Sequence, residues 1–578
     1  MPPNSDSKLI TDASNLLVDA FEDYNARFAD ITRRAKRRFE ARDVSGMHAD
    51  TQERIELYDV CIRETFSRLE KLLADRLFSR GIWQAMRRDY GERVEPLLDA
   101  ELYKTFFNTL SRRFFKTRGT DPALEFVALD IIPTAHITHP AARNNYRVSG
   151  NARSVCQKLL ADYPFKTAYA DLSDDAQRLA TRLTADIQAA EQTNDKHAVV
   201  SIELLKTIFY RAGAAYLVGR VVGAQHYLPC VIALINTPDG VRVDALLTRH
   251  RYISVLFGYT HSAFHANLPT VGDAVVFLRT LLPHKPVDEL YTALGRLKQG
   301  KTERYRQFFG QLEQHPDEQL KPAPGDRGLV MAVFTLPSYP LVFKVIRDKF
   351  GPTKPFGREQ VIDRYHRVFH HTRVGRLVDA QEFRFLRFPL SQFSSALLEE
   401  LRNTCEQTVE INNDTVTIRH CYVERRVTPL NLYLAQADEA DAKDIISDYG
   451  QAICDLTHSN IFTGDLLLKN FGVTRTGRVV LYDYDEVTLV TDCTFRPIPP
   501  ARSEEDEFND QPWYAIETGD VFPEQFPRFM GLKPDYLHYL KQCHGELFDY
   551  RWWREQQRAI AAGNAVMLRP YPRTQMLD

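Results

Sequence analysis

Residues 460–473 read NIFTGDLLLKNFGV, and this stretch decides the fold of the C-terminal half. Asp465 and Asn470 stand five residues apart in it, which is the spacing of the aspartate and the asparagine in the protein-kinase catalytic loop. In that loop the aspartate contacts the substrate hydroxyl and the asparagine binds a metal ion. Either residue alone could be an ordinary turn residue, so the neighbouring sequence has to decide.

Two further carboxylates follow the loop at the distance that a kinase requires. Asp483 stands thirteen residues after Asn470, at the end of the β-prone run 478–482, where a kinase places the metal-binding aspartate of its D-F-G motif. Asp485 comes two residues later. Clustered carboxylate and amide oxygens at a strand end predict a Mg²⁺ site, with Mn²⁺ as the alternative ion.

A lysine lies upstream in the position expected for phosphate binding. Lys344 is set in the β-prone run LVFKVI, residues 341–346, as in the V-A-I-K strand of kinases. Burial of an unpaired ammonium is costly, so Lys344 either points to solvent or meets phosphate oxygens and a carboxylate. The sequence does not choose between the candidate partners Glu359, Glu382, Glu399 and Glu400.

A glycine-containing turn precedes the lysine strand. It consists of Ala323, Pro324, Gly325, Asp326, Arg327, Gly328 and Leu329, and the apolar run 330–334 follows it. Such a turn between two strands can close over the phosphates of ATP, although an ordinary hairpin would look similar. Residues 424–427, after another β-prone run, are interpreted as the hinge whose backbone would hold adenine, with solvated charged side chains.

The pattern departs from ordinary protein kinases in two places. Thr463 and Gly464 stand where the His-Arg of H-R-D is expected, and no A-P-E triplet follows Asp485. The missing arginine is the usual partner of an activation-loop phosphate, so regulation by such a phosphate is not expected. The sequence predicts an atypical kinase.

The rest of the chain indicates a second, mostly helical domain. A chain of 578 residues is too long for one hydrophobic core. Apolar residues recur at helical spacing near the start, at Leu16, Leu17, Ala20, Phe21, Tyr24, Phe28 and Ile31. The β-prone runs 217–222, 230–235 and 252–257 predict a small antiparallel sheet within this half.

Pro and Gly residues near position 320 mark the domain boundary. The predicted fold class is α+β, with a mostly helical regulatory domain at 1–319 and a bilobal protein-kinase-like domain at 320–578. The N-lobe is expected at about 320–427 and the C-lobe at about 428–578.

Charge and cysteine content limit the partners and the cellular location that we expect for this protein. Lys and Arg total 74 against 76 Asp and Glu, which gives no reason to expect nucleic acid or a membrane surface as partner. The eight cysteines form no C-x-x-C pair, which argues against a disulfide framework and against a structural zinc site. No apolar run reaches the roughly 20 residues of a membrane helix, so we expect a cytoplasmic protein.

Several longer stretches resemble the bacterial isocitrate dehydrogenase kinase/phosphatase family. They are APGDRG from 323, VFTLP from 333, VFKVI from 342, DAQEF from 379, KNFGVT from 469, YDYDE from 482 and GDVFPE from 519. The resemblance implies one active site that phosphorylates a serine of isocitrate dehydrogenase with ATP, removes that phosphate, and hydrolyses ATP. It also implies control of flux between the tricarboxylic acid cycle and the glyoxylate bypass, adenine-nucleotide or metabolite effectors, and a homodimer.

The resemblance also implies roles for individual residues of this sequence. The resemblance implies that 323–329 and Lys344 bind ATP or ADP, and that Asp379 serves activity, chiefly in the phosphatase direction, although Asp379 could equally be a helix cap.

In the mechanism expected from these positions, Asp465 orients the substrate serine or accepts its proton, while Asn470 and Asp483 hold the metal. Asp485 assists the metal or positions a water molecule. The alternatives are a single-function atypical kinase, a small-molecule phosphotransferase, or a nucleotide-sensing binding module.

Overall fold

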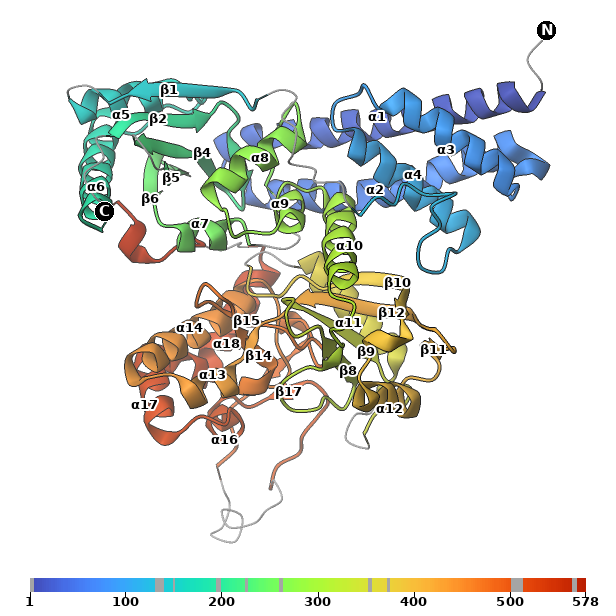
Figure 1. Ribbon diagram of the computed structural model, residues 1–578. Coiled ribbons are helices and arrows are strands. Elements are labelled where there is room, and N and C mark those ends of the chain that lie inside the picture. Colours follow the sequence, from blue (N-terminus) through green and yellow to red (C-terminus); the bar gives the residue numbers. More distant parts are fainter. Residues whose placement is uncertain are drawn as a thin grey trace.

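The structure is a computed structural model. It describes residues 5–129, 140–148, 151–193, 199–223, 227–258, 264–351, 356–371, 375–500, 513–563 and 569–577. Figure 1 shows two bodies, with the first half of the chain above and the second half below. The α+β class is confirmed, with a helical first half that contains a sheet and a bilobal second half.

Four long helices begin the first half. They are α1 (Ser5–Glu40), α2 (Val44–Leu73), α3 (Arg80–Val94) and α4 (Ala100–Phe115). The apolar stripe predicted from the sequence is the inner face of α1, where Leu17, Phe21 and Tyr24 are buried. Asp43 caps α2 by accepting a hydrogen bond from the Gly46 N–H at 2.8 Å.

A six-stranded antiparallel sheet completes this half. Its strands are β1 (Arg143–Arg147), β2 (Val199–Leu205), β3 (Phe209–Arg211), β4 (Ala214–Gly223), β5 (Tyr227–Thr237) and β6 (Gly240–Leu247). Their order is β1-β2-β4-β5-β6, and β3 pairs with β4. One face packs against α5 (Ala152–Ala161) and α6 (Leu172–Thr193), and the other belongs to the core of the long helices. Both faces are covered, so β4 is an almost continuous apolar run.

The third β-prone run was predicted wrongly. Residues 252–257 belong mostly to helix α7 (His250–Leu256) and form no strand. Ile253, Leu256 and Phe257 are buried on one side at spacings of three and four residues. Packing of that face against the core therefore outweighs the β-propensity of the individual residues.

Three helices lead from the sheet to the second half: α8 (Val271–Leu281), α9 (Val287–Ala293) and α10 (Leu297–Gln314). Figure 1 shows α10 descending onto the sheet of the lower body. Its Phe308 and Leu312 share a core with Phe334 and Phe343 of that sheet. The helix that ends the first half is thus a packing partner of the second.

The N-lobe is a second antiparallel sheet with two helices. It contains β7 (Lys321–Pro322), β8 (Met331–Thr335), β9 (Leu341–Ile346), α11 (Arg358–His371), β10 (Gln381–Pro389), α12 (Ser395–Thr404), β11 (Val409–Ile411) and β12 (Thr415–Arg425). The strand order is β10-β12-β9-β8-β7, and β11 pairs with β12. Lys344 on β9 lies opposite Tyr422 on β12.

The C-lobe is mostly helical. It contains β13 (Thr428–Pro429), α13 (Leu430–Gln436), α14 (Glu439–His458), β14 (Phe471–Val473), β15 (Val479–Leu481), β16 (Thr494–Phe495), β17 (Asp520–Val521), α16 (Phe526–Phe529), α17 (Pro534–Cys543) and α18 (Tyr550–Ala561). Short 3₁₀ turns are η1 (Ala74–Arg76), η2 (Leu390–Gln392), η3 (Leu468–Asn470), η4 (Val490–Asp492), η5 (Pro523–Gln525), η6 (Gly545–Phe548) and η7 (Arg573–Gln575).

The end of the chain returns to the first half. The Leu577 N–H donates to the Asp244 carbonyl at 2.8 Å, and Arg569 forms an ion pair with the Asp244 carboxylate, also at 2.8 Å. Figure 1 places the C-terminus beside α6. The two halves are therefore tied together both by α10 and by the last residues.

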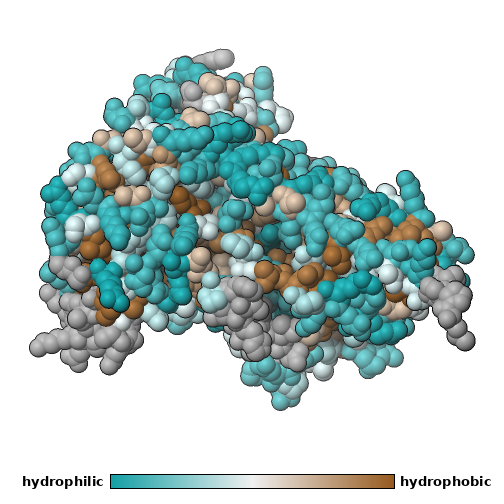
Figure 2. All heavy atoms as spheres, turned by 90° about the horizontal axis from the view of Figure 1, so that it is seen from above, coloured by the Kyte–Doolittle hydropathy of each residue, from teal (hydrophilic) through white to brown (hydrophobic). Residues whose placement is uncertain are grey.

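The face of the molecule seen from above in the view of Figure 1 is largely polar. Figure 2 shows a face on which hydrophilic residues predominate and hydrophobic residues form separate small areas. Within the described ranges, no helix combines the length and the apolarity that a membrane span requires.

Candidate active site

A cavity of about 400 Å³ lies between the two lobes of the second half. We call it the nucleotide cavity. Nine of the predicted site residues line it: Asp326, Arg327, Gly328, Leu329, Lys344, Asp465, Asn470, Asp483 and Asp485. Ala323, Pro324, Gly325 and Asp379 are not among its lining residues. The structure thus brings together residues that are up to 159 positions apart in the sequence.

Hydrogen bonds hold the loop from Asp465 to Asn470 in shape. The Asn470 side-chain amide donates to the Asp465 carboxylate, which also accepts the Leu467 N–H at 3.4 Å. The Asn470 backbone carbonyl accepts the N–H groups of Tyr482 at 3.1 Å and Asp483 at 3.3 Å. These bonds fix the end of β15 beside the loop, so Asp465, Asn470 and Asp483 occupy one wall.

Gly464 explains why the loop lacks the usual arginine. Its φ of +79° lies in the left-handed region that favours glycine. A Cβ at this position would lie 2.6 Å from both the backbone oxygen and the Cβ of Glu486. The close approach of the segment after β15 therefore excludes any side chain here.

Lys344 finds its carboxylate partner on the neighbouring strand. Its Nζ lies 2.8 Å from Glu424 Oε2 and donates to the Tyr482 carbonyl at 2.5 Å. The exposed fraction is 4% for Lys344 and 1% for Glu424. Burial raises the pKa of Glu424 to about 7, although Lys344 opposes that rise. Through the Tyr482 carbonyl, Lys344 joins the N-lobe to the segment after β15 that carries Asp483.

None of the four glutamates that the sequence suggested as partners of Lys344 pairs with it. Glu400 is paired with Arg347, and Glu382 with Arg384 and His420. Glu359 and Glu399 are exposed.

Strand register could have identified Glu424. Lys344 lies opposite Tyr422 in antiparallel β9 and β12. Residue 424, two positions beyond Tyr422, is therefore on the same face and diagonal to the lysine. Arg364 of α11 does not contact Lys344 in this way; it donates to the Asp485 carbonyl.

Asp379 lies outside the nucleotide cavity. Its carboxylate accepts from Arg304 of α10 at 3.0 Å and from Gln381 at 3.1 Å. Arg304 is 1% exposed and also bonds Asp288 of α9 at 2.8 Å. The neighbouring Val378 carbonyl accepts the Tyr484 hydroxyl at 2.6 Å. Asp379 is thus held by the first half of the chain, one residue from a contact with the metal-site segment.

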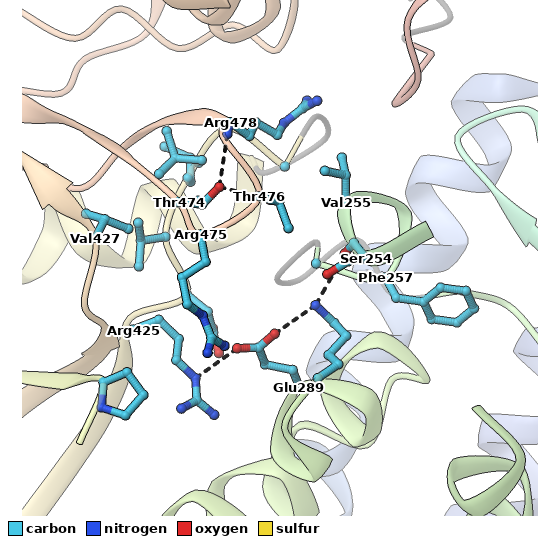
Figure 3. Close-up of a pocket in the computed structure, with 18 of the residues that line it drawn as sticks. Ser254, Val255, Phe257, Glu289, Arg425, Val427, Thr474, Arg475, Thr476 and Arg478 are labelled. Atoms are coloured by element: carbon cyan, nitrogen blue, oxygen red, sulfur yellow. Dashed lines mark hydrogen bonds and ion pairs between the residues drawn. The ribbon is translucent and has the colours of Figure 1, made fainter. Parts of the chain in front are cut away.

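Asp379 lines a second cavity of about 160 Å³ between the two halves, which we call the interdomain cavity. Figure 3 shows Arg425 and Arg475 turned toward Glu289. Glu289 lies 2.8 Å from both Arg425 and Lys285. Burial alone would raise the pKa of Glu289, but these two cations hold it well below its usual range. Arg425 was expected in solvent, and that prediction was wrong because α9 covers it.

Comparison with known proteins gives consistent matches over the whole chain. The family model described as the "Isocitrate dehydrogenase kinase/phosphatase (AceK), regulatory domain" matches residues 14–316, and the corresponding kinase-domain model matches residues 318–573. The isocitrate dehydrogenase kinase/phosphatase of Xanthomonas campestris pv. campestris (strain 8004) is 49% identical over 578 residues, covering 100% of this chain and 99% of that protein.

A more distant relative agrees. The protein of the same name from Anaeromyxobacter sp. (strain Fw109-5) is 42% identical over 568 residues, covering 97% of each chain. A solved structure of a kinase domain with AMP-PNP and sucrose covers 43% of this chain and 82% of its own at 10% identity. Its TM-score of 0.20 is too low to carry an argument.

Proposed function

The chain belongs to the isocitrate dehydrogenase kinase/phosphatase family, and we propose that it phosphorylates a serine of isocitrate dehydrogenase with Mg-ATP and removes that phosphate at the same site. The observation that carries the proposal is the convergence of Lys344, Asp465, Asn470 and Asp483 on one cavity. ATP hydrolysis, control of the glyoxylate bypass and a cytoplasmic location belong to the same proposal. So does the division at residue 320, which is supported by the ranges that the two family models match.

The chain's own residues suit a phosphoryl transfer. Lys344, oriented by Glu424, would place its ammonium on the phosphates of ATP. Asp465, held by Asn470, would orient the serine hydroxyl and accept its proton. The loop residues from Asp326 to Leu329 line the same cavity and would cover the phosphates.

The cavity also fits a divalent cation. Because the Asn470 amide nitrogen is engaged with Asp465, its amide oxygen can serve as a ligand together with the Asp483 carboxylate. A bound Mg²⁺ or Mn²⁺ would offset the negative charge of the phosphates. Asp485 lies in the same wall and would complete the ligand set or hold a water molecule.

For the phosphatase direction we assign different tasks to the two remaining carboxylates. Asp485 faces the nucleotide cavity, so it would position the water or the ADP that receives the phosphate. Asp379 does not line that cavity and would act as a positioning residue. Its neighbour Val378 bonds Tyr484, which stands between Asp483 and Asp485.

The adenine-nucleotide or metabolite effectors are placed by this proposal in the interdomain cavity. Its lining includes Lys285, Arg425, Arg426, Arg475 and Arg478, which suit an anion. It also includes Arg304 and Asp379, so a bound effector would contact the residues that join the two halves. A homodimer remains an expectation from the family.

Incubation of the protein with isocitrate dehydrogenase and Mg-ATP tests the function. We expect intact-mass analysis to show one added phosphate with loss of dehydrogenase activity, and both changes to reverse when ADP replaces ATP. The Asp465→Ala variant should lose kinase turnover by about a hundredfold or more. Asp317→Ala, at an exposed position, is the matched control. ATP hydrolysis without transfer would point to another substrate.

A further inference from the structure

A second group of chemically active side chains lies away from both cavities, in the C-lobe. Cys454 of α14 faces His544, which follows α17, and Glu546 of η6. The Cys454 Sγ lies 3.9 Å from His544 Nδ1 and 3.7 Å from Glu546 Oε1. His544 Nδ1 and Glu546 Oε1 are 3.2 Å apart. A thiol, an imidazole nitrogen and a carboxylate oxygen therefore converge on one point.

These separations are those of ligands around one small cation. Tetrahedral Zn²⁺ with Zn–S of about 2.3 Å and Zn–N or Zn–O of about 2.0 Å sets its ligand atoms about 3.3 to 3.6 Å apart. The three observed distances, 3.2, 3.7 and 3.9 Å, require side-chain shifts of only a few tenths of an ångström.

The histidine is oriented as a metal ligand. Its Nε2 lies 3.0 Å from the Ser447 carbonyl, which can only accept, so Nε2 carries the hydrogen. In the neutral ring Nδ1 then presents a lone pair to the Glu546 carboxylate, an unfavourable contact unless a proton or a cation lies between them. A ligating histidine commonly donates its other N–H to a backbone carbonyl.

The helix beneath is built to receive this ring. A Cβ on Gly450 of α14 would lie 2.3 Å from His544 Cδ2. Any side chain at position 450 would collide with the imidazole.

We propose that Cys454, His544 and Glu546 bind a divalent cation of the zinc type, with water as the fourth ligand. On binding, the Cys454 S–H bond breaks, its proton leaves to solvent, and a sulfur–metal bond forms. The thiolate and the carboxylate then balance the two charges of the ion. The Glu546 side chain is 39% exposed, which leaves access for the ion and the water. The site would fasten α14, which leads into the catalytic loop, to the segment between α17 and α18.

The other candidate group among the described residues does not share these features. Asp23, Cys61 and Glu64 also cluster, but the Arg27 guanidinium already contacts all three, at 3.4, 3.4 and 3.0 Å. The Arg27 guanidinium thus already supplies the positive charge in this second cluster. Cys61 is therefore a matched control for Cys454.

Titration of the metal-free full-length protein with Co²⁺ and then Zn²⁺ tests the proposal. We expect one equivalent of Co²⁺ to give a thiolate-to-cobalt charge-transfer band that Zn²⁺ abolishes. Cys454→Ser should remove the band and weaken binding about a hundredfold or more, whereas Cys61→Ser should leave both unchanged. Zn²⁺ should also raise the Tm of the wild type and not that of Cys454→Ser.

Glu546→Gln keeps the test decisive if Cys454→Ser does not fold, because its side chain is partly exposed. That variant should keep the wild-type circular dichroism spectrum and bind Co²⁺ at least about tenfold more weakly. Absence of the band in the wild type, or its persistence in Cys454→Ser, would overturn the proposal. Either result would leave Cys454, His544 and Glu546 as a hydrogen-bonded cluster without a metal ion.

Discussion

The nucleotide cavity and the interdomain cavity have no lining residue in common and differ in charge. Asp326, Asp465, Asp483, Asp485 and Glu486 make the first mainly acidic. The second is mainly basic. Its lining includes two arginines of the hinge, Arg425 and Arg426, and two arginines of the loop between β14 and β15, Arg475 and Arg478. An acidic wall requires a cation before it can accept phosphates, whereas a basic wall attracts an anion directly.

The two cavities are nevertheless joined at adjacent residues. Glu424 pairs with Lys344 in the nucleotide cavity, and the next residue, Arg425, pairs with Asp288 and Glu289 in the interdomain cavity. A displacement of α9 would therefore be transmitted to β12, whose Glu424 pairs with Lys344. The difference in charge separates two binding tasks, and β12 couples them.

The largest effect is expected where the two cavities meet. Above pH 7, where the Glu424 carboxyl is ionised, Glu424→Gln leaves the Lys344 ammonium buried without its counter-charge, which should lower the free energy of unfolding by about 3 to 5 kcal/mol and raise the KM for ATP. Chemical denaturation and ATPase assays measure these changes. Glu359→Gln, at an exposed position in α11, should change neither. Equal effects of the two substitutions would refute the pairing.

The second-largest effect is expected at the contact between Arg304 of α10 and Asp379. Arg304→Gln removes the cation that joins Asp288 to Asp379, so we expect a loss of about 3 kcal/mol of stability. The phosphatase rate should fall more than the kinase rate, since the nucleotide cavity does not contain Arg304. Arg304→Lys should restore part of the phosphatase rate. An equal loss of both activities would indicate a purely structural role.

The pH dependence sharpens the assignment of Glu424. Because the pKa of this carboxyl is raised from 4.5 to about 7, the folded protein retains a proton that the unfolded chain has released between those values. The free energy of unfolding should therefore decrease as the pH rises from about 5 to 7. Over the same range Glu424 ionises and can orient Lys344, so kinase activity should rise. Both trends should be weaker in Glu424→Gln, and an unchanged profile in that variant would contradict the assignment.

The smallest effect is expected in the interdomain cavity alone. Arg475 is exposed and lines that cavity, so Arg475→Ala should leave the Tm unchanged. It should weaken binding of an adenine nucleotide there by about tenfold, the loss of one charge-assisted hydrogen bond. Calorimetric titration with AMP measures the affinity of the interdomain cavity. AMP is chosen because it lacks the outer phosphates that the nucleotide cavity would hold. Wild-type affinity in the variant would place the effector elsewhere.

The sequence by itself predicted that Asp465, Asn470 and Asp483 would lie together, and all three line the nucleotide cavity. Spacing sufficed because a kinase loop is a local structure, in which thirteen residues or fewer separate successive members. The apolar face of α1 followed in the same way from a period that a single helix imposes.

Only the tertiary structure decided which distant groups meet. The pairing of Lys344 with Glu424 depends on the register of β9 and β12, and the position of Asp379 depends on the packing of α10 against the second half. The cluster of Cys454, His544 and Glu546 joins residues ninety positions apart, which no spacing rule covers. Local patterns fix elements and motifs, whereas contacts between elements depend on packing and strand register, which a single sequence does not display.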